Sequence, residues 1–121
     1  MAEHNQLGIK GEKIASNFLQ NIGYQVVENN WREKKFEIDI IAIDKNELVF
    51  IEVKTRSSSV FGEPEEAVTL KKQKHLIEGA DYYMNEKEID LECRFDVISI
   101  IHHKNQNTIN HFINAFYPEV D

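Results

Sequence analysis

The segment FEIDIIAIDKNELVFIEVKTR, residues 36–56, constrains the fold of this chain more than any other. Two runs rich in isoleucine and valine flank one polar interruption, Asp44 to Glu47. This pattern predicts two β-strands joined as a hairpin with its turn at Lys45-Asn46. Extended toward the open end of the hairpin, the same register places Asp39 opposite Glu52 and Glu37 opposite Lys54.

Side chains alternate along a strand, so the register also assigns the two faces of the hairpin. One face carries Ile41, Ile43, Leu48 and Phe50, followed at the open end by Glu37, Asp39, Glu52 and Lys54; the other carries Ile38, Ile40, Ala42, Val49, Ile51 and Val53. The wholly apolar face is expected to pack on a core. The face with the acids is expected to open into a cleft.

Two ionised carboxylates that face each other on a sheet repel unless positive charge lies between them. A divalent cation such as Mg²⁺ fits, since it takes one or two carboxylates and also accepts phosphate oxygens. With Lys54 on the same face, Asp39 and Glu52 then indicate a metal-dependent phosphodiesterase. The alternative is a purely structural pair, neutralised by Lys54 and a neighbouring basic side chain.

Length and composition predict one domain spanning residues 1–121, with 41% hydrophobic residues to form a single modest core. No apolar run approaches the roughly 20 residues needed to cross a bilayer, and the N-terminus lacks the apolar stretch of a secretory signal. A cytoplasmic protein without membrane contact is therefore expected. The only cysteine, Cys93, excludes an internal disulfide framework and is expected to be buried in a strand.

The net charge of −7 argues against a protein that coats DNA by bulk electrostatics. Its distribution is uneven, because residues 32–74 hold nine basic and nine acidic residues and the rest of the chain carries the whole excess. Basic residues therefore gather around the hairpin. They indicate either a local rim that grips a few phosphates or simply a solvated surface.

The remaining elements follow from periodicity and turn signals. We expect helices at residues 3–22 and 69–84, strands at 24–31, 94–101 and 108–116, a basic link at 32–35, a turn at 102–107 and a polar loop at 56–66. Together with the hairpin, this order predicts an α/β sandwich around a central mixed sheet. The five histidines form no ligand pattern, and no phosphate-binding glycine loop is present in the sequence.

Five ordered segments carry a resemblance: residues 11–32, FEIDIIAID, LVFIEVKTRSS, FGEPEEAV and RFDVISI. They resemble the small bacterial YraN-like family, which is similar to archaeal Holliday junction resolvases. The order Glu12, Glu37-Ile38-Asp39, Glu52-Val53-Lys54 also resembles the wider PD-(D/E)xK nuclease superfamily. That superfamily has a restriction endonuclease-like αβββαβ sandwich, here with one extra C-terminal strand.

The resemblance implies a Mg²⁺- or Mn²⁺-dependent endonuclease that hydrolyses DNA phosphodiesters, with branched or junction DNA as a candidate substrate. It implies Asp39, Glu52, Glu12 and the Val53 carbonyl as metal ligands, Lys54 as the catalytic lysine beside those acids, and Arg32, Lys35, Arg56, Ser57, Lys71, Gln73 and Lys74 as DNA contacts. Symmetric cutting of a junction would require a two-fold homodimer.

One residue departs from the YraN-like pattern, because Phe36 stands where that family usually has glycine before Glu37. Alternation places Phe36 on the face away from Asp39, so the acidic site need not be blocked while the approach of DNA changes. A second function class remains open. The chain can instead be a catalytically silent module that binds nucleic acid or protein on a nuclease fold.

Overall fold

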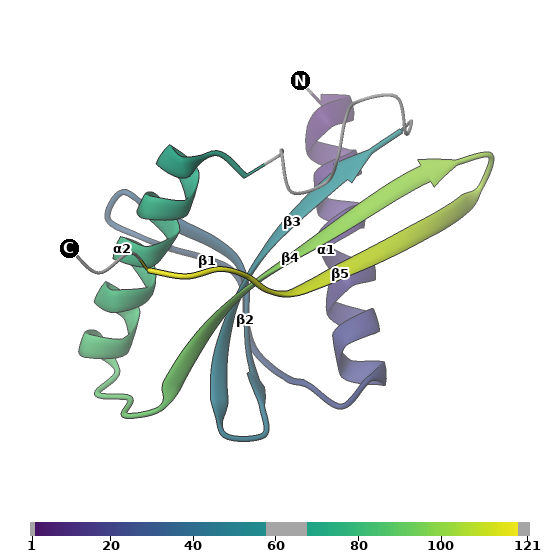
Figure 1. Cartoon of the computed structure of the whole chain (residues 1–121). Coiled ribbons are helices and arrows are strands. Elements are labelled where there is room, and N and C mark those ends of the chain that lie inside the picture. Colours follow the sequence, from purple (N-terminus) through teal and green to yellow (C-terminus); the bar gives the residue numbers. More distant parts are fainter. Residues whose placement is uncertain (1, 58–67, 119–121) are drawn as a thin grey trace.

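The polypeptide forms one five-stranded sheet with a helix on each face (Figure 1). The computed structural model describes residues 2–57 and 68–118. The elements are α1 (Ala2–Asn21), β1 (Gln25–Glu33), β2 (Phe36–Asp44), β3 (Glu47–Arg56), α2 (Leu70–Glu86), β4 (Glu92–His103) and β5 (Gln106–Phe116). Strands lie in the order β1-β2-β3-β4-β5, with β3 and β4 parallel and every other pair antiparallel.

This arrangement confirms the expected fold class. The chain is α/β with a mixed sheet, and its order αβββαβ plus one strand is compatible with a restriction endonuclease-like core. In the sequence, α2 connects β3 to β4. These two strands are parallel neighbours in the sheet, and such a pair needs a long crossover connection. Most of the polar loop expected at 56–66 lies outside the described residues.

The hydrophobic core consists of two layers, one on each face of the sheet. Ala15 and Leu19 of α1 pack on one face, and Leu76, Ala80 and Tyr83 of α2 pack on the other. Each helix therefore buries one apolar face against the sheet, as an amphipathic helix does. The helix predicted at residues 3–22 extends one residue too far, since α1 ends at Asn21 and Ile22 beyond it is 48% exposed.

Three local predictions were wrong. The link at 32–35 is not a separate segment, because β1 extends to Glu33 and leaves only Lys34-Lys35 as the turn into β2. His102 and His103 lie in β4 rather than in a turn, since cross-strand pairing with β5 continues to His103↔Gln106. Cys93 is exposed, because β4 begins at Glu92 and its buried run starts only at Arg94.

A buried charged network at β4 was not predicted at all. The Arg94 guanidinium donates to both carboxylate oxygens of Asp96, at 2.9 and 3.0 Å, and to the Tyr24 hydroxyl at 2.6 Å. His111 of β5 lies 2.8 Å from Asp96 through Nε2, and the Asn114 backbone N–H donates to the same carboxylate. This network ties β4 to β5 and to the chain after α1.

Candidate functional site at the end of the β2–β3 ladder

The hairpin has the predicted register, but it separates one residue before the acids. Pairing runs from Asp44↔Glu47 to Ile40↔Ile51 and ends there. The predicted cross-strand pairs Asp39–Glu52 and Glu37–Lys54 are therefore not formed. Instead, the Asp39 carboxylate accepts a hydrogen bond of 2.8 Å from the backbone N–H of Val53. In a continuing ladder, a backbone carbonyl would accept a hydrogen bond from such an N–H. Here a side-chain oxygen accepts it instead.

Strict alternation fails at the same place. Ile38 packs in the core beneath α2, whereas Ile40 packs in the core beneath α1 and Ile41 again beneath α2. The prediction that Ile38 shares a face with Ile40 was therefore wrong, and so was the prediction that Glu37 lies opposite Lys54. Glu37 lies opposite Arg32 of β1 and forms an ion pair with it at 2.7 Å.

Asp39 and Glu52 nevertheless meet, joined by a side-chain hydrogen bond. Burial, the negative charge of Asp39 and this hydrogen bond raise the pKa of Glu52 from 4.5 to about 8, against the opposing charge of Lys72. Burial also raises the pKa of Asp39, although the Val53 amide and Glu52 partly oppose it. The charge of Lys72 therefore compensates the two acids only in part, and a bound cation would stabilise the ionised pair further.

Glu12 adds a third acid from α1. Burial and the charges of Asp39 and Glu37 raise the pKa of Glu12 to about 7, and Arg32 opposes the shift. Within residues 2–57 and 68–118, however, no three acidic, histidine or cysteine side chains are grouped closely enough to hold one metal ion. The chemistry of the donors thus fits a hard cation held by Asp39 and Glu52, with Glu12 farther out.

Gly11 fixes the distance between α1 and this site. A Cβ atom at Gly11 would lie 2.9 Å from the Thr55 Cβ and closer still to the Thr55 hydroxyl, so β3 leaves no room for a side chain. We expect Gly11→Ala to lower the free energy of unfolding by about 1–3 kcal/mol, because the helix must move off β3. Chemical denaturation measures this value.

The control for that substitution is Gly8→Ala in the same helix, where an added Cβ would meet nothing within 4 Å. Alanine is the better helix former by roughly 0.8–1.0 kcal/mol, so Gly8→Ala should be neutral or stabilising. Equal effects of the two substitutions would contradict the close packing of Gly11 on Thr55.

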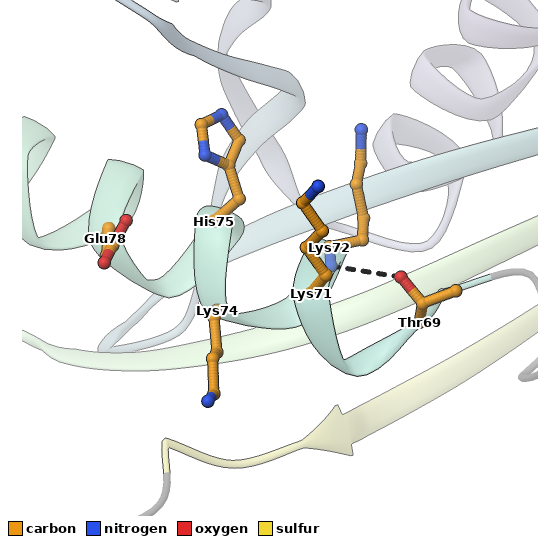
Figure 2. Close-up of a pocket in the computed structure, with 6 residues that line it drawn as sticks. All are labelled: Thr69, Lys71, Lys72, Lys74, His75 and Glu78. Carbon is orange, nitrogen blue, oxygen red and sulfur yellow. Dashed lines mark hydrogen bonds between the residues drawn. The ribbon is translucent and has the colours of Figure 1, made fainter.

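Two lysines flank the acids, and only one was assigned to the site from the sequence. Lys72 of α2 lies 3.5 Å from Glu52 through its ammonium group. Its position follows from the start of α2, where Thr69 caps the helix by accepting the Lys72 backbone N–H (Figure 2). Lys54, the predicted catalytic lysine, is exposed on β3 and has no ion pair among the described residues.

The helix α2 also forms one wall of an open hollow of about 560 Å³, lined by Thr69, Lys71, Lys72, Lys74, His75 and Glu78. Figure 2 shows Lys71, Lys72 and His75 rising from one side of the helix while Lys74 points to the other. The hollow is therefore basic on the side from which Lys72 reaches Glu52. The run Lys71-Lys72 was the only sequence signal for it.

The other predicted DNA contacts lie around this region in different settings. Lys35 is exposed in the β1–β2 turn, and Arg56 and Ser57 stand at the end of the described part of β3 and just after it. The Gln73 amide donates to the Val68 carbonyl at 3.1 Å, which directs it toward the chain just before α2. DNA contact by these side chains stays a prediction.

The raised pKa of Glu52 makes the stability of the fold depend on pH. Folded Glu52 keeps its proton up to about pH 8, whereas the unfolded chain releases it near 4.5. This contribution is complete below pH 4.5 and is lost as the pH rises to 8. We expect wild-type stability to fall across that window relative to Glu52→Gln, by on the order of a few kcal/mol, in denaturant titrations.

Millimolar Mg²⁺ or Mn²⁺ provides the matching check at pH 8 and above. A cation held by the ionised pair stabilises the folded state in proportion to its binding, so it should recover stability in wild type and not in Glu52→Gln. Parallel pH profiles of the two proteins would contradict the assigned environment of Glu52.

The fold and these acids define an α/β protein whose candidate site lies where two strands of its sheet separate. A family model described as "Uncharacterised protein family UPF0102" matches residues 11–100. UPF0102 proteins of Bacteroides thetaiotaomicron, Phocaeicola vulgatus and Flavobacterium psychrophilum are 48%, 45% and 46% identical to this chain. Each match covers at least 97% of this chain and 98% or more of the relative. The chain belongs to the UPF0102 family, as the YraN-like resemblance predicted.

Among the described residues, neither helix is long and apolar enough to cross a membrane.

Proposed function

We propose that this protein is a Mg²⁺- or Mn²⁺-dependent endonuclease that hydrolyses DNA phosphodiester bonds, with branched or junction DNA as its substrate. The observation that carries the proposal is the close pair of Asp39 and Glu52 beside Lys72, with Glu12 farther out but near enough for the charge of Asp39 to raise its pKa. Keeping three acids in an unfavourable environment costs stability, and such sites are typical of function. The proposal includes kinship with the PD-(D/E)xK superfamily and with archaeal Holliday junction resolvases.

The site residues divide the work of hydrolysis among them. Asp39 and Glu52 would hold the metal, with the Val53 carbonyl as a further ligand; when bound, the metal would supply charge neutralisation and a more acidic water. With a pKa of about 7, Glu12 is suited to accept a proton from the attacking water near neutral pH. Lys54 and Lys72 would stabilise negative charge that develops on the phosphate.

The basic residues around the hairpin would position the DNA. Contacts from Arg32, Lys35, Arg56, Ser57, Lys71, Gln73 and Lys74 would hold the backbone on either side of the scissile bond. Such contacts orient a duplex without reading its sequence. Because one chain offers one site, symmetric cutting of a junction would use a homodimer.

Cleavage assays test the proposal. Branched, duplex and single-stranded DNA are incubated with wild type, Glu52→Gln and Lys54→Ala in Mg²⁺, Mn²⁺ or EDTA. We expect metal-dependent cleavage by wild type and strong loss in both variants. Equal cleavage by all three proteins would identify a contaminant and refute the proposal.

A second function is favoured by the Lys72–Glu52 ion pair and by the absence of a three-ligand group among residues 2–57 and 68–118. A lysine that neutralises the acids would leave a catalytically silent module that binds nucleic acid or protein. Calorimetric titration with Mn²⁺ separates the two functions. Binding that Glu52→Ala abolishes supports the enzyme, whereas salt-sensitive DNA binding without metal binding supports the module.

A further inference from the structure

Four aromatic rings from α2, the end of β1 and the start of β2 form a continuous row. His75 lies 5.4 Å from Phe36, Phe36 lies 5.6 Å from Tyr82, and Tyr82 lies 6.3 Å from Trp31, between ring centroids. The interplanar angles are 40°, 34° and 40°, so the rings follow one another at a moderate tilt. We call these four residues the ring row.

The row depends on Gly79. His75 and Tyr82 are seven residues apart and so lie on one side of α2, with Gly79 between them. The position of a Cβ at Gly79 would be 3.3 Å from the Phe36 Cβ and 3.4 Å from the ring. A residue without a side chain thus allows Phe36 to sit between the two helical rings. All four rings are only half-buried, so packing leaves part of each accessible.

Lysines lie beside three of the four rings. The Lys34 and Lys35 ammonium groups lie 5.9 Å from the Tyr82 and Phe36 centroids, respectively. At the other end, Lys71 and Lys72 rise from the same side of α2 as His75 (Figure 2). Glu33 and Glu86 lie near Tyr82, so the charge is mixed at the Trp31 end and basic toward Lys72.

We propose that the ring row binds unpaired nucleotides, so that the substrate is DNA in which a single strand adjoins a duplex. Aromatic side chains interleaved with lysines are the arrangement that binds single strands, because bases stack on the rings while lysines contact phosphates. A base-paired strand cannot offer its base faces to such a row. The inference deepens the proposed function, on which its assignment of a substrate rests.

The position of the row relative to the acids supports this reading. Lys72 ion-pairs with Glu52, and Tyr82 lies ten residues farther along the same helix. That separation is about 15 Å along the helix axis, or roughly four nucleotides at the rise of a stacked strand. An unpaired strand lying on the row would thus bring the phosphates near its junction with the duplex to the carboxylates.

Binding without cleavage tests the inference. Fluorescence anisotropy in EDTA compares single-stranded DNA, blunt duplex and duplex with a single-stranded arm, using wild type and Tyr82→Leu. We expect Tyr82→Leu to weaken binding of the two DNAs that contain unpaired bases by about fivefold or more and to leave duplex binding unchanged. Tyr117→Leu is the matched control, because Tyr117 is an exposed tyrosine after β5.

Trp31 supplies a direct readout, since it is the only tryptophan of the chain. We expect single-stranded DNA to quench its fluorescence in wild type and less so in Tyr82→Leu. A second variant is Lys34→Gln, in the β1–β2 turn, which should lower the salt dependence of single-strand binding. Thermal unfolding of Tyr82→Leu and Lys34→Gln shows whether either variant has a folding defect. Unchanged binding in Tyr82→Leu and Lys34→Gln, or binding without a change in Trp31 fluorescence, would overturn the inference.

The two proposals fail in different ways. Loss of the endonuclease proposal would appear as no cleavage by wild type while single-strand binding and Trp31 quenching persist. Loss of the present inference would appear as metal-dependent cleavage that Tyr82→Leu leaves unchanged on DNA with and without unpaired bases.

Discussion

Asp39→Asn should abolish DNA cleavage while making the protein more stable. The substitution keeps an oxygen that can accept the Val53 N–H, so the local backbone is preserved. It removes the charge that a metal would require and that raises the pKa of both Glu12 and Glu52. We expect cleavage to fall by roughly 10³-fold or more, as removal of an essential catalytic group does. Initial rates on labelled branched DNA measure it.

The gain in stability is what distinguishes a functional site from a structural ion pair. Above pH 8, where Glu52 is ionised, loss of the neighbouring charge should raise the free energy of unfolding by on the order of 1 kcal/mol. Asp90→Asn is the control, since it removes the same charge from an exposed position. Destabilisation by Asp39→Asn, together with full cleavage, would show that Asp39 only holds the strands together.

The sequence predicted the hairpin well because its information is local. Two runs rich in isoleucine and valine and one polar turn were enough to predict the strands and the register from Asp44↔Glu47 to Ile40↔Ile51. The same reasoning failed at Asp39, since it assumed that backbone pairing continues. A side chain that captures the Val53 amide ends the ladder, and no periodicity signals that competition.

Long-range partners account for the other omissions. Lys72 meets Glu52 only because α2 packs beside β3, and its sequence neighbours Lys71 and Lys74 look equally suitable. Phe36 was predicted from strict alternation to face away from Asp39, but it packs against His75 and Tyr82 of α2, the helix whose Lys72 reaches Glu52. The place of Phe36 in the ring row depends on Gly79 of α2, which a sequence pattern cannot bring next to Phe36.

Arg94→Met should destabilise the fold more than any other single substitution considered. Asp96 is 1% exposed and accepts from Arg94 twice, from His111 and from the Asn114 N–H. Burial disfavours its charge, but the hydrogen bonds from His111 and Arg94 outweigh it and lower the pKa of Asp96. Removing the guanidinium leaves a buried carboxylate without its main partner. The expected loss is about 3–5 kcal/mol in denaturant titrations.

The other partners of Arg94 provide graded controls. Asp44 and Glu47 each lie 3.1 Å from the guanidinium, but their side chains are 24% and 43% exposed, so Asp44→Asn and Glu47→Gln should cost about 1 kcal/mol or less. Asp96→Asn combined with Arg94→Met should cost less than the two single changes added together, because a neutral amide no longer needs the guanidinium. Additive losses would mean that Arg94 acts through its packing rather than through Asp96. β4 pairs with β3, the strand that carries Glu52. Either result therefore also measures how much the Arg94 network stabilises the strand beside the candidate site.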